Sequence, residues 1–273
     1  MVKTLFKHEF KAWLRVVPLF WLAMLGVAVA GRIVQFFETD SIYYKLVFGS
    51  AMLAYGVAAF VVLLTPTVFG VYRFYRNLFT GEGYLSFTLP VTPAQHLWVK
   101  VITAVCFDVL SLVVLRLSGM VLICGDVLVE VWKAAGYLWK QIVTNIPKDL
   151  AGHLIGYAFE YLVIILAGLL GGHLMYQSCI CIGQLARKNR VLLAVGAYFG
   201  YQLVAQILST IMSVIFMVMG VSGAFDKLLE LMDKHPFASG HVLFSGLAVF
   251  TLALAALFWW ISHRIMSKRL NLE

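Results

Sequence analysis

Hydrophobic residues run along this chain in six long blocks, separated by shorter connections that hold most of its polar residues. A helix needs about 20 mostly apolar residues to cross the hydrocarbon core of a bilayer, and each block reaches that length. The blocks predict six membrane-spanning helices at 16–37, 45–72, 97–126, 151–185, 191–220 and 241–262. The expected fold is therefore all-α, a polytopic membrane protein in which residues 1–273 form a single transmembrane domain.

The first 15 residues follow a different pattern, in which apolar and basic positions each recur with helical spacing. The apolar face carries Val2, Phe6, Phe10, Trp13 and Leu14, and the adjoining stripe carries Lys3, Lys7, Lys11 and Arg15. This pattern predicts an amphipathic helix that lies on the membrane surface before the first span. A cleavable signal peptide is the alternative, because the small-x-small sequence at 28–30 follows a basic start and an apolar run.

Composition excludes most soluble classes of protein. The chain is 62% hydrophobic and 12% charged, whereas a soluble domain has about 25% charged residues. So few ionisable groups cannot cover a soluble enzyme or a nucleic-acid-binding domain, and disorder requires low hydrophobicity. Most of the 21 Lys and Arg residues fall in the two terminal segments and in the 2–3 and 4–5 connections. We expect a plasma-membrane protein, and the positive-inside rule predicts that both termini lie in the cytoplasm, so the net charge of +8 reflects orientation in the lipid bilayer.

The sequence contains no pattern typical of an active site. No Lys follows a Gly, so the chain has no Gly-Lys-Ser/Thr phosphate loop. The seven His residues are scattered, and Cys179 and Cys181 fall on different sides of a helix. We therefore expect no enzyme activity, no catalytic residue, no bound metal and no cofactor in this chain.

The connection between the second and third spans is rich in Tyr, Phe and Leu on a side where water is expected. Exposed apolar residues in such a place usually contact something, which favours a docking element over a loop folded against lipid headgroups. The sequence at 92–95 is a capping box with a proline at the first helical position, so a helix should begin near Pro93.

This connection resembles the linker and coupling helix of ABC-2-type transporter permeases, particularly the small six-span permeases of Gram-positive bacteria. The matching runs are Phe74-Tyr75-Arg76-Asn77-Leu78-Phe79-Thr80, Glu82-Gly83-Tyr84-Leu85, Thr88-Leu89-Pro90-Val91-Thr92-Pro93 and Lys100. The resemblance implies a type V exporter-like architecture and export of a peptide, a lipid or an amphipathic compound. It also implies a pair of permeases, identical or sister, and separate ATPase subunits that bind ATP and Mg and dock on the coupling segment 73–96. The implied coupling residues are Arg76, Asn77, Thr80, Glu82, Gly83, Tyr84, Leu85, Phe87 and Leu89.

Three charged residues fall within predicted spans, where an unpaired charge is costly. Arg116 and Glu160 lie at similar depths below the outer ends of the third and fourth spans. They are predicted to form an intramembrane ion pair that holds the two helices together or serves transport. Asp108 lies too far along the axis to bond with Arg116, and the sequence leaves it as an unpaired intramembrane charge.

The fifth span carries one polar stripe at steps of three and four residues. Its members are Tyr198, Gln202, Gln206, Ser209 and Ser213. Polar stripes in lipid face other helices or a wet cavity. The stripe therefore predicts a transport pathway or subunit interface, with packing inside one bundle as the alternative. The pairs Gly168/Gly172 and Gly196/Gly200 predict close helix contacts.

The alternative to the transporter function is a membrane protein that transports nothing, such as a sensor, a scaffold or a toxin-immunity protein.

Overall fold

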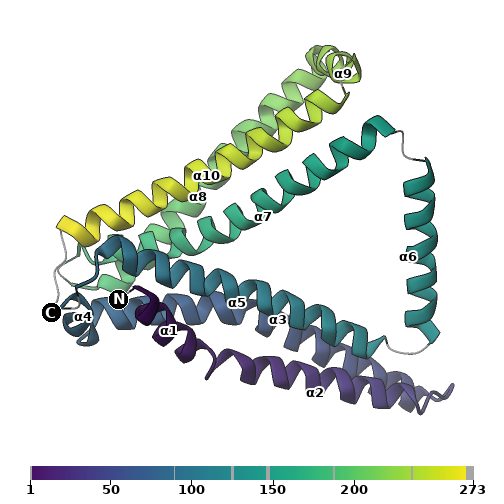
Figure 1. Cartoon of the computed structure of the whole chain (residues 1–273), viewed down its shortest axis with the longest axis horizontal. Coiled ribbons are helices and arrows are strands. Elements are labelled where there is room, and N and C mark those ends of the chain that lie inside the picture. The colour runs from purple at the N-terminus through teal and green to yellow at the C-terminus, as the bar shows by residue number, and fades with distance from the viewer. Residues whose placement is uncertain are drawn as a thin grey trace. The chain divides into compact units, whose positions relative to one another are not determined.

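The computed structural model describes residues 2–88, 90–123, 126–145, 148–186, 188–234 and 236–268, and all secondary structure in these ranges is helical (Figure 1). The helices are α1 (Val2–Trp13), α2 (Val17–Gln35), α3 (Ile42–Phe79), α4 (Glu82–Thr88), α5 (Pro93–Leu122), α6 (Asp126–Asn145), α7 (Lys148–Gly183), α8 (Arg190–Val221), α9 (Ala224–Lys234) and α10 (Pro236–Lys268).

Six of these segments are long and apolar enough to cross a membrane. They are Val2–Gln35, which comprises α1 and α2, followed by α3, α5, Gly152–Gly183 of α7, α8 and Phe237–Lys268 of α10. The prediction of an all-helical, multi-pass membrane protein is confirmed at this level. Several helices extend past the apolar blocks that predicted them: α3 ends at Phe79 rather than near residue 72. A helix satisfies its own backbone hydrogen bonds, so it can continue into more polar sequence beyond the block.

The chain divides into two compact units, and the boundary falls inside α3. The first unit comprises Met1–Phe74 and Leu89–Ile146, and the second comprises Tyr75–Thr88 and Pro147–Glu273. Each unit has its own packing.

In the first unit, α1 and α2 both pack against α5. Trp13, Val17, Ala104 and Phe107 are fully buried at this contact. The Phe107 ring lies 5.0 Å from the rings of Phe10 and Trp13, measured between centroids. The helix predicted to rest on the membrane surface is thus packed through one face onto the helix bundle, while its basic stripe is exposed.

In the second unit, α7 packs along α10 and α8, and α9 contacts α8 and α10. The turn from α7 to α8 depends on Gly183, where a Cβ atom would lie 2.6 Å from the Arg190 carbonyl oxygen. The predicted glycine pairs instead border open space, since a Cβ atom at Gly168, Gly172, Gly196 or Gly200 would have no neighbour within 4 Å. No described residue of α8 is buried.

Candidate functional site

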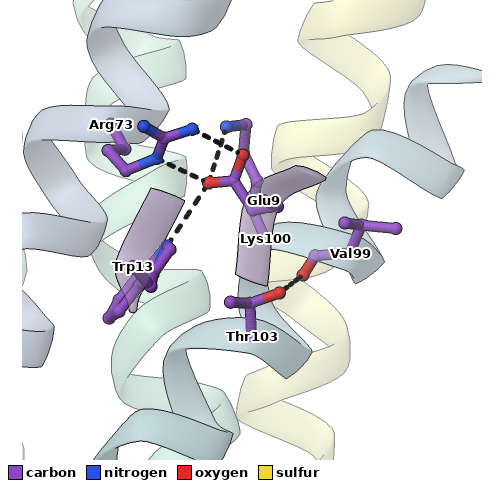
Figure 2. A network of polar contacts seen from close by, with 6 residues as sticks. All are labelled: Glu9, Trp13, Arg73, Val99, Lys100 and Thr103. Carbon is purple, nitrogen blue, oxygen red and sulfur yellow. Dashed lines mark hydrogen bonds and ion pairs between the residues drawn. The ribbon is translucent and has the colours of Figure 1, made fainter. Parts of the chain in front are cut away.

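A buried carboxylate joins three helices of the first unit. The Glu9 side chain of α1 accepts two hydrogen bonds from Arg73 of α3, both 2.9 Å long, one to each carboxylate oxygen. Lys100 Nζ of α5 and Trp13 Nε1 of α1 each lie 3.4 Å from Glu9 Oε1. Figure 2 shows the guanidinium, the ammonium and the indole converging on this one carboxylate.

Local sequence explains how α1 presents these groups. Glu9 and Trp13 are four residues apart, so they share one face of the helix, and both are buried. The Glu9 side chain is 7% exposed and that of Lys100 is 8% exposed. On α5, the Thr103 hydroxyl donates to the Val99 carbonyl oxygen at 2.7 Å, which satisfies a polar group beside the network.

Electrostatics keeps Glu9 ionised. Burial raises the pKa of Glu9, but hydrogen bonding from Arg73 and the positive charges of Lys100 and Arg73 outweigh burial and lower this pKa to about 2. A bidentate Arg–carboxylate pair is strong and fixes geometry as well as charge. The network therefore ties α1 to α3 and α5.

The predicted coupling segment contains a short helix with its own ion pair. Arg76, near the end of α3, contacts Glu82, the first residue of α4, at 3.0 Å, and both side chains are about half exposed. The Thr80 hydroxyl donates to the Arg76 carbonyl oxygen, and Gly83 N donates to the Thr80 carbonyl oxygen at 2.7 Å. The segment thus folds back on the end of α3, with the Tyr84 side chain 54% exposed.

The other coupling residues are placed to different extents. Asn77 lies in α3 between Arg76 and Thr80. Leu85 and Phe87 belong to α4, and their side chains, like residue Leu89 as a whole, lie outside the described part. The capping box that begins α5 is confirmed, because Thr92 Oγ1 accepts from Gln95 N and Gln95 Oε1 accepts from Thr92 N.

The polar stripe of the fifth span lies along α8 and is mostly uncovered. Tyr198 stacks on Tyr176 of α7, and its hydroxyl accepts a 2.8 Å bond from Gln202. Below it, Gln202 and Gln206 line an open hollow of about 670 Å³ whose other walls are apolar residues and Thr210. The Ser213 hydroxyl donates to the Ser209 carbonyl oxygen of the same helix.

One of the intramembrane charges, Glu160, has a partner that the sequence did not name. Glu160 Oε1 lies 2.9 Å from Nδ1 of His241 on α10. Arg116 belongs to the first unit and Glu160 to the second, so their pairing stays a prediction. Asp108 takes part in an interaction, so its description as an unpaired charge is wrong.

No group of three or more metal-ligating side chains occurs within the described ranges. No family model, curated protein or solved structure matches the chain. Sequence reasoning missed Glu9, although it is the only acidic residue among the first 37. A lone carboxylate next to Phe10 and Trp13 on the inward face of a basic helix is the signal that could have identified it.

Proposed function

We propose that this chain is the permease subunit of an ATP-binding-cassette transporter in the plasma membrane. In this proposal both termini are cytoplasmic, two permeases form the transport unit, and separate ATPases bind ATP and Mg. The cargo is an exported peptide, lipid or amphipathic compound, and the architecture is that of ABC-2 permeases. Catalysis of ATP hydrolysis belongs to the partner.

The observation that carries the proposal is the short helix α4 between two long apolar helices. A docking element must be exposed and yet rigidly attached to a helix that reaches into the membrane. The Arg76–Glu82 pair and the Thr80 hydrogen bonds attach α4 to the end of α3, and the exposed Tyr84 ring offers an aromatic contact. Arg73 lies one turn before Arg76 on α3. The same helix therefore carries both the docking element and the arginine that binds Glu9.

The coupling surface can be tested by reversing one charge and removing one ring. We expect the double variant Glu82→Lys/Tyr84→Ala to lose association with its ATPase by at least tenfold, since both a charge and an aromatic anchor are lost. The measurement is affinity purification of the tagged full-length chain from its own host. The co-purifying protein that contains a phosphate loop is identified by mass spectrometry, and its ATPase rate is measured with and without the chain.

Glu230→Lys provides the matched control. Glu230 of α9 forms an equally short 3.0 Å ion pair with Lys234, and both side chains are exposed. It should leave ATPase recovery and stimulation unchanged. Equal recovery and stimulation with the double variant and the wild type, or the absence of any phosphate-loop protein, would contradict the proposal.

The α8 stripe is proposed to face a second permease across the pathway. A Gln amide that faces hydrocarbon without a partner is costly, and the amide is self-complementary because it both donates and accepts. We expect Gln206→Cys, in a chain without its native cysteines, to form an oxidative dimer in native membranes. Leu208→Cys is the control, because Leu208 is also exposed and lies about 200° around the helix. Equal crosslinking at both positions would argue against an interface along the stripe.

A further inference from the structure

Two imidazoles and a carboxylate form a hydrogen-bonded line between α7 and α10 of the second unit. His153 Nδ1 lies 3.0 Å from His241 Nε2. On the other side of the same ring, His241 Nδ1 lies 2.9 Å from Glu160 Oε1. His153 and Glu160 are separated by about two turns of α7, so the line extends about 10 Å along the helix.

The surrounding residues hold both rings in place. The His153 ring stacks on Phe237, with centroids 4.4 Å apart and an interplanar angle of 4°. The Tyr157 ring stacks on His241 at 4.2 Å, and its hydroxyl donates to the Phe237 carbonyl oxygen at 2.8 Å. This stacking directs the ring nitrogens along the line.

Two glycines make room for this arrangement. A Cβ atom at Gly156 would lie 2.8 Å from His241 Cε1, and one at Gly240 would overlap the Tyr157 hydroxyl. The backbone of each helix therefore lies against a ring from the other helix: Gly156 of α7 against His241, and Gly240 of α10 against Tyr157. A position that needs both glycines and stacked rings is a built site rather than a chance contact of polar side chains.

In the state with an ionised Glu160 and two neutral imidazoles, the hydrogen bonds assign each proton. The carboxylate then only accepts, so Nδ1 of His241 carries hydrogen and its Nε2 accepts. Nδ1 of His153 must then be the donor in the next bond, which leaves Nε2 of His153 without hydrogen. With Glu160 ionised and both imidazoles neutral, the line has a net charge of −1. Glu160 Oε2 is buried and has no hydrogen-bond partner in the part of the chain that the structure describes.

We propose that His153, His241 and Glu160 form a proton-binding site. A proton delivered by a hydronium ion, which leaves as water, forms an N–H bond at Nε2 of His153. The Nδ1 proton of His153 can then pass to His241, and the Nδ1 proton of His241 can pass to Glu160, with no other bond broken. The net charge changes from −1 to 0, so the protonated line no longer holds an uncompensated carboxylate and the contact between α7 and α10 becomes tighter. The site does not depend on the proposed transport function.

Among the described side chains, few other charges lie near this line. On α7 the nearby titratable residues with described side chains are Tyr157 and Tyr161, whereas the side chains of Lys148 and Asp149, about one turn before His153, lie outside the described part. On α8 the one charged residue is Arg190, at its first position. Glu230 and Asp233 of α9 line a hollow with Ser239 of α10, and Glu230 is paired with Lys234. The remaining charged residue of α9 with a described side chain is Asp226.

Nuclear magnetic resonance of the full-length protein in lipid bilayers, with ¹⁵N-labelled histidine, tests this site. We expect a coupling between Nδ1 of His153 and Nε2 of His241 across their hydrogen bond. Between pH 8.5 and 5 the two histidines should take up one proton together. Glu160→Gln should displace the midpoint of this uptake, because the carboxylate that accepts the proton of His241 is lost. His263, which stacks on Trp259 of α10, is the internal control and should titrate identically in both proteins.

Two further variants test whether the coupling depends on the position of the His241 ring. Gly156→Ala should abolish the coupling by displacing the His241 ring, whereas Tyr157→Phe should preserve it because the ring still stacks. If Gly156→Ala does not fold, His153→Gln replaces it and should change the titration of His241. Independent titration of the two histidines, an unchanged midpoint in Glu160→Gln, or no coupling in the wild type would overturn the proposal.

Discussion

Replacing Glu9 by Gln should destabilise the protein by about 3–5 kcal/mol, the cost of leaving buried charges without their partner. The variant keeps the shape of the side chain but leaves Arg73 and Lys100 facing a neutral amide, with Lys100 8% exposed. Thermal unfolding of the detergent-purified protein measures the loss. Limited trypsin digestion should also cleave faster at the exposed Lys7 and Lys11, because α1 is released from the bundle.

The matched control is Glu82→Gln. Glu82 also pairs with an arginine at 3.0 Å, but its side chain is 50% exposed, so its loss should cost less than about 1 kcal/mol. Adding Lys100→Met to Glu9→Gln should recover part of the stability, because a buried cation is removed. Equal unfolding temperatures for Glu9→Gln and the wild type would show that the network contributes nothing.

Acidic pH should reduce the difference in unfolding temperature between the wild type and Glu9→Gln. The pKa of Glu9 is lowered from 4.5 to about 2 on folding, so its stabilisation is complete above pH 4.5 and is lost as the pH falls through 2. The two unfolding temperatures should therefore converge as the solution is acidified over that range.

Local features of the fold could be predicted from the sequence because they depend on neighbouring residues. Apolar blocks predicted the spanning helices, and the Thr92 capping box predicted where α5 begins. The partners of Glu9 could not be predicted in this way, since Arg73 is 64 positions away and Lys100 is 91. Helical spacing identifies which face of α1 is apolar, but it does not identify what that face packs against.

Glu160 illustrates the same limit inside the apolar region. Similar depth suggested Arg116 as its partner, and that pairing stays a prediction, because depth does not specify which neighbouring helix a side chain faces. The structure places His241 against Glu160, 81 positions away. A signal was present in α7, where His153, Tyr157 and Glu160 recur at steps of four and three and so form one polar face.

The glycines show why a GxxxG motif alone is weak evidence for a close contact between helices. The GxxxG pairs predicted close contacts, but close contacts occur at other glycines, among them Gly156 and Gly240, where a ring from the facing helix needs the space. Spacing of small residues describes one helix only. The need for a glycine arises from the partner, and the partner depends on tertiary structure.

Phe107→Ala should destabilise the first unit by about 3–5 kcal/mol through loss of contacts and creation of a cavity. The Phe107 side chain is fully buried, and its ring is 5.0 Å from Phe10 and Trp13 and 5.9 Å from Trp21, measured between centroids. These rings belong to α1 and α2, so one truncation weakens both contacts with α5. Lipid is as apolar as a protein core, so the loss comes from packing rather than from exposure to water.

Phe60→Ala distinguishes buried packing from exposure to lipid. Phe60 of α3 is 62% exposed, and its truncation should cost less than about 1 kcal/mol. Thermal unfolding measures both variants, and trypsin cleavage at Lys11 reports on α1 alone. If Phe107→Ala unfolds at the temperature of Phe60→Ala and α1 stays protected, the aromatic cluster does not attach α1. If α1 instead becomes accessible in both Phe107→Ala and Glu9→Gln, packing and charge hold the same helix in place.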